Sequence, residues 1–331
     1  MPAVTPFFTR PKLRPGVAVS RSNGSVDVLY RDQGCTLDIG DLSRTDVVRL
    51  LDLLQRGSHT PVELKERFAA LADQIDELLD ELDRLGLLTE ATLTSPAGQL
   101  TGRQFYRELV RFTDRMKRRV AGSEYQQRLQ ANQVSRNQLI GYVVEYYHLV
   151  HRAPSLVAPA LGHVDTALTR ELLQDFLVSE MHHDRMLAES LRHVDVDEAT
   201  LERCEPLSTT FALCATLGAL AHQHLLSFKS VLFLFEEPYE EFNTAFEQRA
   251  AAVGLPAGFT RPVLKHSRLN EEGEHDEITR ALLSEVAAVS PEEQLVVKKH
   301  VGITVETLVK LEHHILDYYG DPGNPVPRVF A

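Results

Sequence analysis

Hydrophobic residues recur at helical spacing along most of the chain after residue 102. Apolar positions three and four residues apart mark seven stretches, at 105–120, 135–151, 165–193, 209–237, 239–253, 262–289 and 291–319. Such spacing is typical of amphipathic helices. Strand signals are nearly absent and the joints are short, so we predict a helical bundle over residues 103–320. The proline-rich end, 321–331, is expected to be extended.

The N-terminal part follows a different pattern. Residues 17–20 and 26–30 read as strands on either side of Asn23-Gly24, which predicts a β-hairpin. Three helical stretches follow; the second begins with the cap sequence Thr60-Pro61-Val62-Glu63, and the third ends near Gly86. We therefore predict a small α+β domain over residues 12–91. A linker rich in Thr, Ser, Pro and Gly, 92–102, joins it to the bundle.

Composition narrows the function classes. The chain has 331 residues, 47 acidic against 35 basic, and a net charge of −12. This excess disfavours nucleic acid as a partner, since binding it requires clustered Lys and Arg. Three scattered cysteines form neither a disulfide framework nor a zinc site. No apolar run is long enough to span a membrane, and the N-terminus lacks the apolar core of a signal peptide. We predict a cytoplasmic protein.

Glutamate and histidine pairs at helical spacing are the candidate chemistry. Glu180 and His183 stand three residues apart in a predicted helix. Glu236 ends an apolar helical stretch, and a third cluster holds His266, Asn270, Glu271, Glu272 and His275. In a helical bundle, carboxylates and imidazoles from facing helices are the usual ligands of dinuclear iron or manganese sites. An isolated Glu-x2-His pair is more often a surface pair, so the prediction depends on the whole set.

The segments QLIGYVVEYYHLVHRAPSLVAPAL and LLQDFLVSEMHHDRMLAESL carry a family resemblance. They resemble the second to fourth helices of haem-oxygenase-like oxidases, a group that includes PqqC-like cofactor-free oxidases, TenA-like thiaminases and diiron oxidases. The resemblance extends over residues 103–320. In the diiron branch, a Glu and a His from one helix precede a second Glu by fifty to sixty residues. Glu180, His183 and Glu236 match this order, and the resemblance implies that they bind iron.

The last element of that branch, His-x3-Asp-x2-His, is altered here. The chain has Asn270 in place of the Asp, and His275 follows His266 by nine residues instead of seven. Nine residues rotate a helix by about 900°, which places the two imidazoles on opposite faces. Both can bind one site only if the helix is unwound or bulged, as Gly273 would permit. Glu272 then takes the role of the Asp, with Glu271 as a close competitor.

Two further residues, Glu145 and His148, lie on the predicted second helix of the bundle. They could support the ligands or replace one of them. Tyr142, Tyr146 and Tyr147 beside them are more typical of core and cavity lining.

The order of elements at the N-terminus, ending in RLGLLTE, resembles the PqqD-like winged-helix peptide chaperone of pyrroloquinoline quinone biosynthesis. The resemblance covers about eighty residues. It implies that residues 12–91 recognise a leader peptide, which adds a strand to the hairpin edge. A structural appendage or a dimerisation wing is the alternative reading. The oligomeric state is open, with a homodimer as one option.

These observations favour a non-haem diiron oxidase or oxygenase that uses O2. It would hold two iron ions per chain, or manganese, and act on a precursor peptide or an amino-acid-derived metabolite. One alternative keeps the fold without the metal, as a PqqC-like cofactor-independent oxidase; the Asn270 substitution favours it. A second alternative is a non-enzymatic ligand- or peptide-binding regulator.

Overall fold

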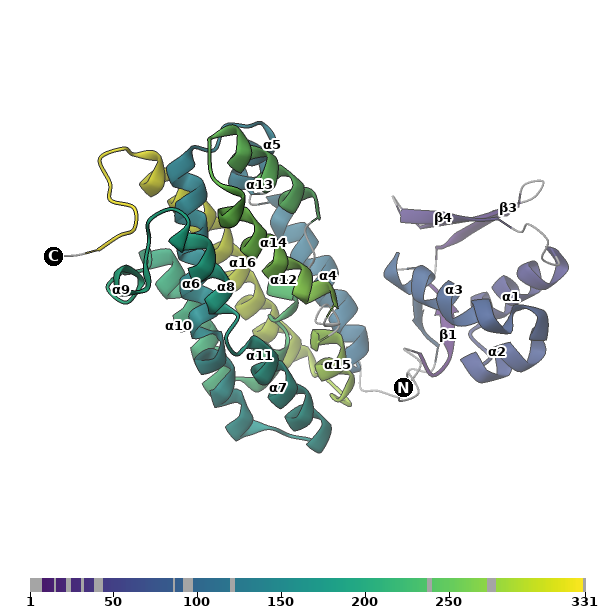
Figure 1. Cartoon of the computed structure of the whole chain (residues 1–331). Helices are drawn as coiled ribbons and strands as arrows, with labels where there is room; N and C mark the ends of the chain where they lie inside the picture. The colour runs from purple at the N-terminus through teal and green to yellow at the C-terminus, as the bar shows by residue number, and fades with distance from the viewer. Residues whose placement is uncertain are drawn as a thin grey trace. The chain divides into compact units, whose positions relative to one another are not determined.

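The computed structural model describes residues 8–14, 16–21, 25–30, 33–38, 44–85, 87–91, 98–119, 123–236, 240–272 and 278–329. For residues 21, 33, 38, 44, 118, 119, 236 and 269–272 it describes the backbone alone. The chain divides into two compact units, Met1–Arg107 and Glu108–Ala331. The first holds the strands and three helices, and the second is helical (Figure 1). None of the described helices is long and apolar enough to cross a membrane.

The N-terminal unit is built on a three-stranded antiparallel sheet. Its strands, in the order β2-β3-β4, are Ala18–Arg21, Ser25–Tyr30 and Gln33–Asp38. A separate antiparallel pair joins β1 (Pro11–Leu13) to β5 (Leu88–Glu90). The predicted hairpin is confirmed, because β2 pairs with β3 from Ala18–Leu29 to Arg21–Val26. Strand β4, which the sequence pattern did not indicate, pairs along the whole length of β3.

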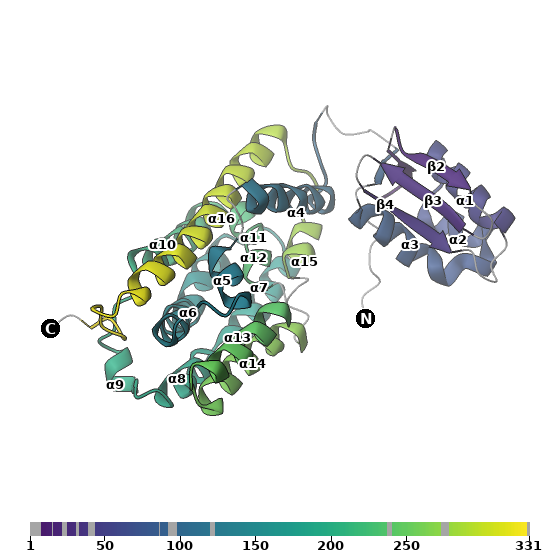
Figure 2. The same cartoon turned by 90° about the horizontal axis from the view of Figure 1, so that it is seen from above.

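Three helices cover one face of that sheet (Figure 2). They are α1 (Arg44–Arg56), α2 (Pro61–Arg67) and α3 (Ala72–Arg84). Val26 and Val28 of β3 are fully buried and join the apolar helix faces in one core. The predicted cap of α2 is confirmed: Thr60 Oγ1 accepts a hydrogen bond from Glu63 N at 3.2 Å, and Thr60 N donates to Glu63 Oε2 at 2.8 Å. Such a box satisfies two backbone donors that the first helical turn leaves unpaired.

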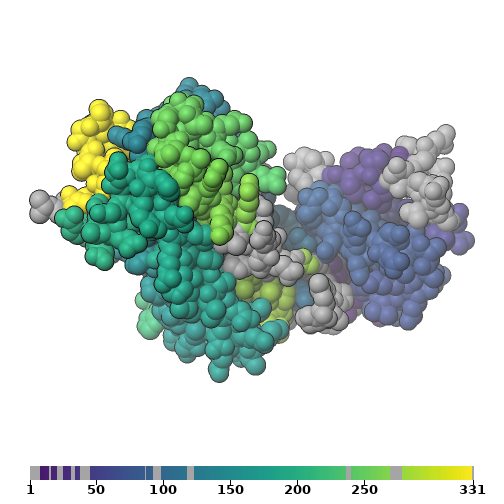
Figure 3. Space-filling model, viewed as in Figure 1, coloured from purple at the N-terminus to yellow at the C-terminus, as the bar shows by residue number. Residues whose placement is uncertain are grey.

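The C-terminal unit is a helical bundle arranged around α6 (Arg136–Val157), which packs against α7, α8, α10 and α16. Helix α14 packs on α8 and α13, as Figure 3 shows in green beside teal. The helices are α4 (Gly102–Arg119), α5 (Glu124–Gln130), α7 (Ala167–Glu180), α8 (Asp184–Arg192), α9 (Glu198–Leu201), α10 (Ser208–Gln223), α11 (Leu225–Lys229), α12 (Phe233–Glu236), α13 (Glu240–Ala252), α14 (Ala257–Glu272), α15 (Ile278–Ser284) and α16 (Pro291–Gly320).

Two of the predicted helices are broken in the structure. The stretch 165–193 is interrupted at residues 181–183, and the stretch 209–237 is interrupted at His224 and again before Phe233. Apolar periodicity continues across these breaks because both halves bury the same side, so the pattern could not reveal them. At His224 the ring Nδ1 accepts a hydrogen bond from Ser227 N at 3.1 Å, which caps the start of α11. The predicted helix 262–289 becomes α14 and α15, and residues 273–277 lie outside the described residues.

The end of the chain returns to the bundle. Val329 forms an antiparallel bridge with Cys204, and Glu205 N donates to Arg328 O at 2.9 Å. The guanidinium of Arg328 donates to Pro206 O at 2.6 Å. These bonds hold the segment after α16 against the chain that leads into α10.

Candidate metal centre

Glu180 and His183 lie at a break between two helices. Glu180 ends α7, and His183 is the residue that precedes the first turn of α8. Between them His182 has a φ of 73°, a left-handed conformation that costs free energy in a residue other than glycine. The prediction that the two residues lie in one helix was therefore wrong. The break nevertheless keeps them together, with Glu180 Oε1 3.7 Å from His183 Nδ1.

His266 reaches the same place from α14. It is 3% exposed, and its ring centroid is 5.1 Å from that of His183, edge to face. Its Nδ1 shares a hydrogen bond of 2.9 Å with the Tyr146 hydroxyl of α6. The structure thus brings together three of the predicted ligands, Glu180, His183 and His266. Packing of α14 on α8 accounts for this meeting.

Two buried imidazole nitrogens in this group lack a hydrogen-bond partner among the described atoms. They are Nδ1 of His183 and Nε2 of His266. A buried polar atom left unpaired costs about 1–3 kcal/mol, so such atoms commonly mark a site for a ligand or ion. Burial lowers the pKa of His266 to about 4. The charge of His183 adds to this lowering, and Glu180 opposes it. His266 is therefore neutral near pH 7, which is the form that binds metals.

The other predicted ligands cannot be placed. The side chains of Glu236, Asn270, Glu271 and Glu272 lie outside the described residues, as does His275 altogether. The backbone shows only that Glu236 is the last residue of α12 and that α14 continues to Glu272. Within the described part of the chain, no group of three or more His, Cys, Asp or Glu side chains is arranged to hold a metal ion. A complete site therefore requires ligands from these segments, and the predicted unwinding near Gly273 stays a prediction.

The described donors are of the chemical kinds that bind iron or manganese, although the described residues alone do not form a group arranged to hold an ion. One carboxylate and two imidazoles offer oxygen and nitrogen ligands, which bind these ions in other helical bundles. Nδ1 of His183 and Nε2 of His266, which have no hydrogen-bond partner among the described atoms, are the observation that fits a metal. Glu180, which is 8% exposed, adds a carboxylate beside them.

Glu145 has a different role from the one considered for it as an alternative ligand. It is 1% exposed and accepts hydrogen bonds from Leu207 N (3.0 Å), Thr210 Oγ1 (2.5 Å) and Tyr319 OH (2.6 Å). Burial raises the pKa of Glu145, and these hydrogen bonds only partly oppose the rise. A Cβ at Gly141 would collide with the ring of Tyr319, so the glycine permits this packing. The carboxylate ties α6 to α10 and α16.

His148 is also buried, at 5% exposure, and its Nε2 has no hydrogen-bond partner among the described atoms. Burial lowers its pKa to about 4, and the positive charges of Arg152 and His151 add to the effect. Its ring meets Tyr147 edge to face at 5.7 Å.

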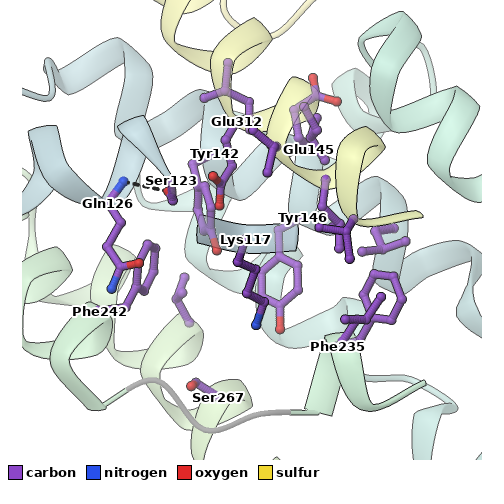
Figure 4. A pocket seen from close by; sticks show the side chains of 18 of the residues that line it. Lys117, Ser123, Gln126, Tyr142, Glu145, Tyr146, Phe235, Phe242, Ser267 and Glu312 are labelled. Carbon is purple, nitrogen blue, oxygen red and sulfur yellow. Dashed lines mark hydrogen bonds between the residues drawn. The ribbon is translucent and has the colours of Figure 1, made fainter. Parts of the chain in front are cut away.

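A cavity of about 450 Å³ is linked to this group by Tyr146, while Glu180, His183 and His266 are not among its described lining residues. Tyr146 lines it while bonding His266, and Ser267 of α14 lines it beside His266 in sequence (Figure 4). Sequence reasoning treated Tyr146 as cavity lining and missed its hydrogen bond to the predicted ligand His266. A hydroxyl in an apolar stretch of α6 was the available signal. The apolar walls include Leu149, Leu234, Phe235, Phe242, Val263, Val305, Leu308 and Ile315. The polar lining includes Lys117, Ser123, Gln126, Tyr142, Asn243 and Glu312.

The chain matches no protein-family model, and no curated protein is similar to it in sequence. Solved structures are similar to it in fold. A domain of unknown function from Shewanella denitrificans, described as heme oxygenase-like, aligns with a TM-score of 0.53 and 14% identity over 65% of this chain and 91% of that one. A TenA homolog from Pseudomonas syringae pv. tomato has a TM-score of 0.53 and 13% identity, covering 64% of this chain and 93% of its own.

A TenA homologue from P. horikoshii aligns with a TM-score of 0.51 and 12% identity, over 64% of this chain and 98% of that one. At such identities the likeness concerns the fold alone. It confirms the predicted fold class: the chain is mostly helical, with a haem-oxygenase-like fold and a small N-terminal region that contains strands.

Proposed function

We propose that this protein is a non-haem, iron-dependent oxidase or oxygenase that uses O2 and oxidises a substrate held in the cavity beside Glu180, His183 and His266. The observation that supports it is a pair of buried imidazole nitrogens that have no hydrogen-bond partner among the described atoms, close to a buried carboxylate and linked by Tyr146 to an apolar cavity. An ordinary core would pair or exclude such atoms. A reactive centre beside a substrate cavity gives them a use.

Two iron ions would be held by these three side chains together with Glu236, Glu272 or Glu271, and His275; manganese is the alternative ion. Bound iron supplies the reduction of O2 and the oxidation of a C–H, C–N or C–C bond of the substrate. The chain's own residues prepare the site. Tyr146 fixes the ring of His266 through Nδ1 and leaves Nε2 for the metal. Leu234, Val263 and their apolar neighbours give the cavity an apolar wall.

The test is metal content after anaerobic loading with Fe(II). We expect about two iron ions per chain, as in other carboxylate-bridged sites of helical bundles, and O2 consumption when the loaded protein meets air. Glu180→Ala, His183→Ala and His266→Ala should each lower iron content. His313→Ala is the matched control, because its side chain is 41% exposed and belongs to no candidate site. No bound iron in the unaltered protein, or equal loss in the control, would refute the proposal.

One observation favours the metal-free alternative, namely Asn270 at the position of an expected acidic ligand. A cofactor-independent oxidase would use histidine and tyrosine side chains to bind a quinone-like substrate. It would consume O2 at the same rate after exhaustive treatment with a chelator. The iron-dependent enzyme would lose activity under that treatment and regain it with Fe(II).

For the N-terminal unit we propose capture of a leader peptide by an exposed sheet edge. Among the described strands, β2 and β4 each pair with β3 alone, so each leaves one edge on which a peptide strand could pair. The full chain should bind a precursor peptide at micromolar concentration and should not bind duplex DNA at low salt. Tight DNA binding would favour the regulator, and binding to neither would leave the unit as a structural appendage.

A further inference from the structure

We infer that His224 is a pH-sensitive helix cap: the neutral ring holds the first turn of α11 in place, and protonation of the ring releases it. The released turn then loosens the chain that leads to Leu234 and Phe235 in the cavity wall. The inference goes beyond the proposed function, because it assigns a regulatory role to a helix break outside the candidate metal centre. It requires no bound metal ion.

The cap is a hydrogen bond to an imidazole. His224 is the N-cap residue of α11, and its Nδ1 accepts from Ser227 N at 3.1 Å. A ring nitrogen accepts a hydrogen bond only when it carries no proton, so the capping ring is neutral, with its proton on Nε2. The usual cap residues, Ser, Thr, Asp and Asn, keep the same charge near neutral pH. Histidine is the side chain whose charge ordinarily changes there, so acid removes this cap.

Protonation leaves a buried donor without an acceptor. Ser227 is fully buried, and a proton on Nδ1 of His224 would point a second N–H at the N–H of Ser227. The hydroxyl of Ser227 is already engaged, because it shares a hydrogen bond of 2.7 Å with Nδ1 of His300 on α16. An unpaired buried donor is unfavourable, so we expect the first turn of α11 to open and water to reach Ser227 N.

Charged neighbours on α16 act in both directions. The rings of His224 and His300 meet edge to face with centroids 5.4 Å apart. Burial lowers the pKa of His300, and the charges of His224 and Lys299 add to the effect, so the two rings disfavour being charged together. Hydrogen bonds from Ser290 lower the pKa of Glu293, and the charge of His224 contributes, so Glu293 favours the protonated ring. Because Glu293 is exposed, water and salt screen its attraction.

The segment that follows the cap reaches the cavity. After α11 the backbone forms overlapping turns, in which Val231 N donates to Phe228 O at 3.2 Å and Leu234 N donates to Val231 O at 3.1 Å. Leu234 and Phe235 line the cavity. Lys229 makes three hydrogen bonds through its ammonium group and holds the end of α11. Opening should therefore be largest before Lys229 and smaller, though present, beyond it.

The experiment is hydrogen–deuterium exchange of the metal-free full chain, measured by mass spectrometry from about pH 8 to about pH 5, on either side of the ordinary histidine pKa. The rates are corrected for the intrinsic effect of pH on exchange. We expect the amides of 225–230 to exchange about fivefold faster in acid, the factor that corresponds to the loss of one helix cap. A smaller increase should extend over 231–235, and the amides of α6 are the reference for global unfolding.

Variants identify the group that titrates. His224→Asn keeps an uncharged acceptor at the cap, so its exchange should stay slow and lose the pH response. His224→Ala removes the acceptor, so the same amides should exchange about fivefold faster at every pH. His222→Asn is the matched control, because this neighbouring histidine is exposed and its ring meets that of His163 at 5.5 Å. It should keep the response of the unaltered chain.

The absence of a pH response over 225–230 in the unaltered chain would overturn the inference. So would a response that persists in His224→Asn or disappears in His222→Asn. Equal acceleration in α6 would show global unfolding in place of a local release, with the same consequence. A response confined to 225–230 would overturn the link to the cavity wall.

Discussion

Replacing Tyr146 by phenylalanine removes one hydroxyl from the proposed metal centre and leaves the ring. That hydroxyl shares a 2.9 Å hydrogen bond with Nδ1 of His266, and the two rings meet edge to face at 5.1 Å. The ring contact survives the change, so His266 should stay buried. What is lost is the bond that fixes its rotation and holds Nε2 in position. Groups that orient a metal-binding histidine in this way typically contribute about 10- to 100-fold to metal affinity.

The expected change in Tyr146→Phe is therefore about 1.4–2.7 kcal/mol in iron binding. Stability should change less, by about 0.5–1.5 kcal/mol, which is the net value of one hydrogen bond. Competition with a chelator of known affinity measures the first, and urea unfolding of the metal-free protein measures the second. Tyr147→Phe is the control, because Tyr147 stacks on His151 at 5.3 Å and does not line the cavity.

Unchanged iron affinity in Tyr146→Phe, together with a large loss in His266→Ala, would refute the reasoning. His266 would then bind metal without orientation by its neighbour. Equal losses in Tyr146→Phe and Tyr147→Phe would instead indicate a general disturbance of α6.

Three other predictions concern stability. Lys229 is 1% exposed and donates a hydrogen bond to Asp165 at 2.9 Å, so Asp165→Ala leaves a buried charge without its partner. We expect the free energy of unfolding, measured by urea titration, to fall by about 3 kcal/mol. This is the low end of the range for a broken buried ion pair, because the side chain of Asp165 is half exposed. Glu145→Ala leaves buried donors such as the Tyr319 hydroxyl unpaired and should cost about 3 kcal/mol or more in the same assay. The pKa of His148 is about 4 in the fold, below its ordinary value of 6.5, so the unfolded chain binds more protons between these pH values. Stability should therefore fall as pH drops from about 6.5 to about 4, and His148→Phe should flatten that part of the measured pH profile.

Local patterns determined most of the helices and several of their ends. The spacing of apolar residues predicted α6 and α16, and the cap residues Ser135 and Ser290 form the hydrogen bonds that start them. These features depend on residues three and four positions apart, so the sequence contains them directly. The same is true of the two strands that flank Asn23-Gly24 in the sequence, which pair as predicted.

The family resemblance, more than periodicity, selected Glu180, His183 and His266 from the chain's many carboxylates and histidines. The structure brings the three together but through a geometry that spacing did not contain. The helix predicted over residues 165–193 is interrupted at His182, whose backbone is left-handed. This residue separates α7 from α8, which the apolar pattern had predicted as one helix. A helix ends where the packing and hydrogen bonding around it require, and apolar periodicity contains no information about either.

Tertiary structure alone decided the contacts between distant segments. Tyr146 meets His266 across 120 residues, and Glu145 meets Tyr319 across 174. Nothing in the local sequence distinguishes a tyrosine that lines a cavity from one that also holds a histidine. Which side chains meet depends on how whole helices pack, and that is determined by the sum of many apolar contacts over the bundle. The sequence supplied the elements and the chemical groups, and the packing of α8, α14 and α6 placed three of those groups in one site.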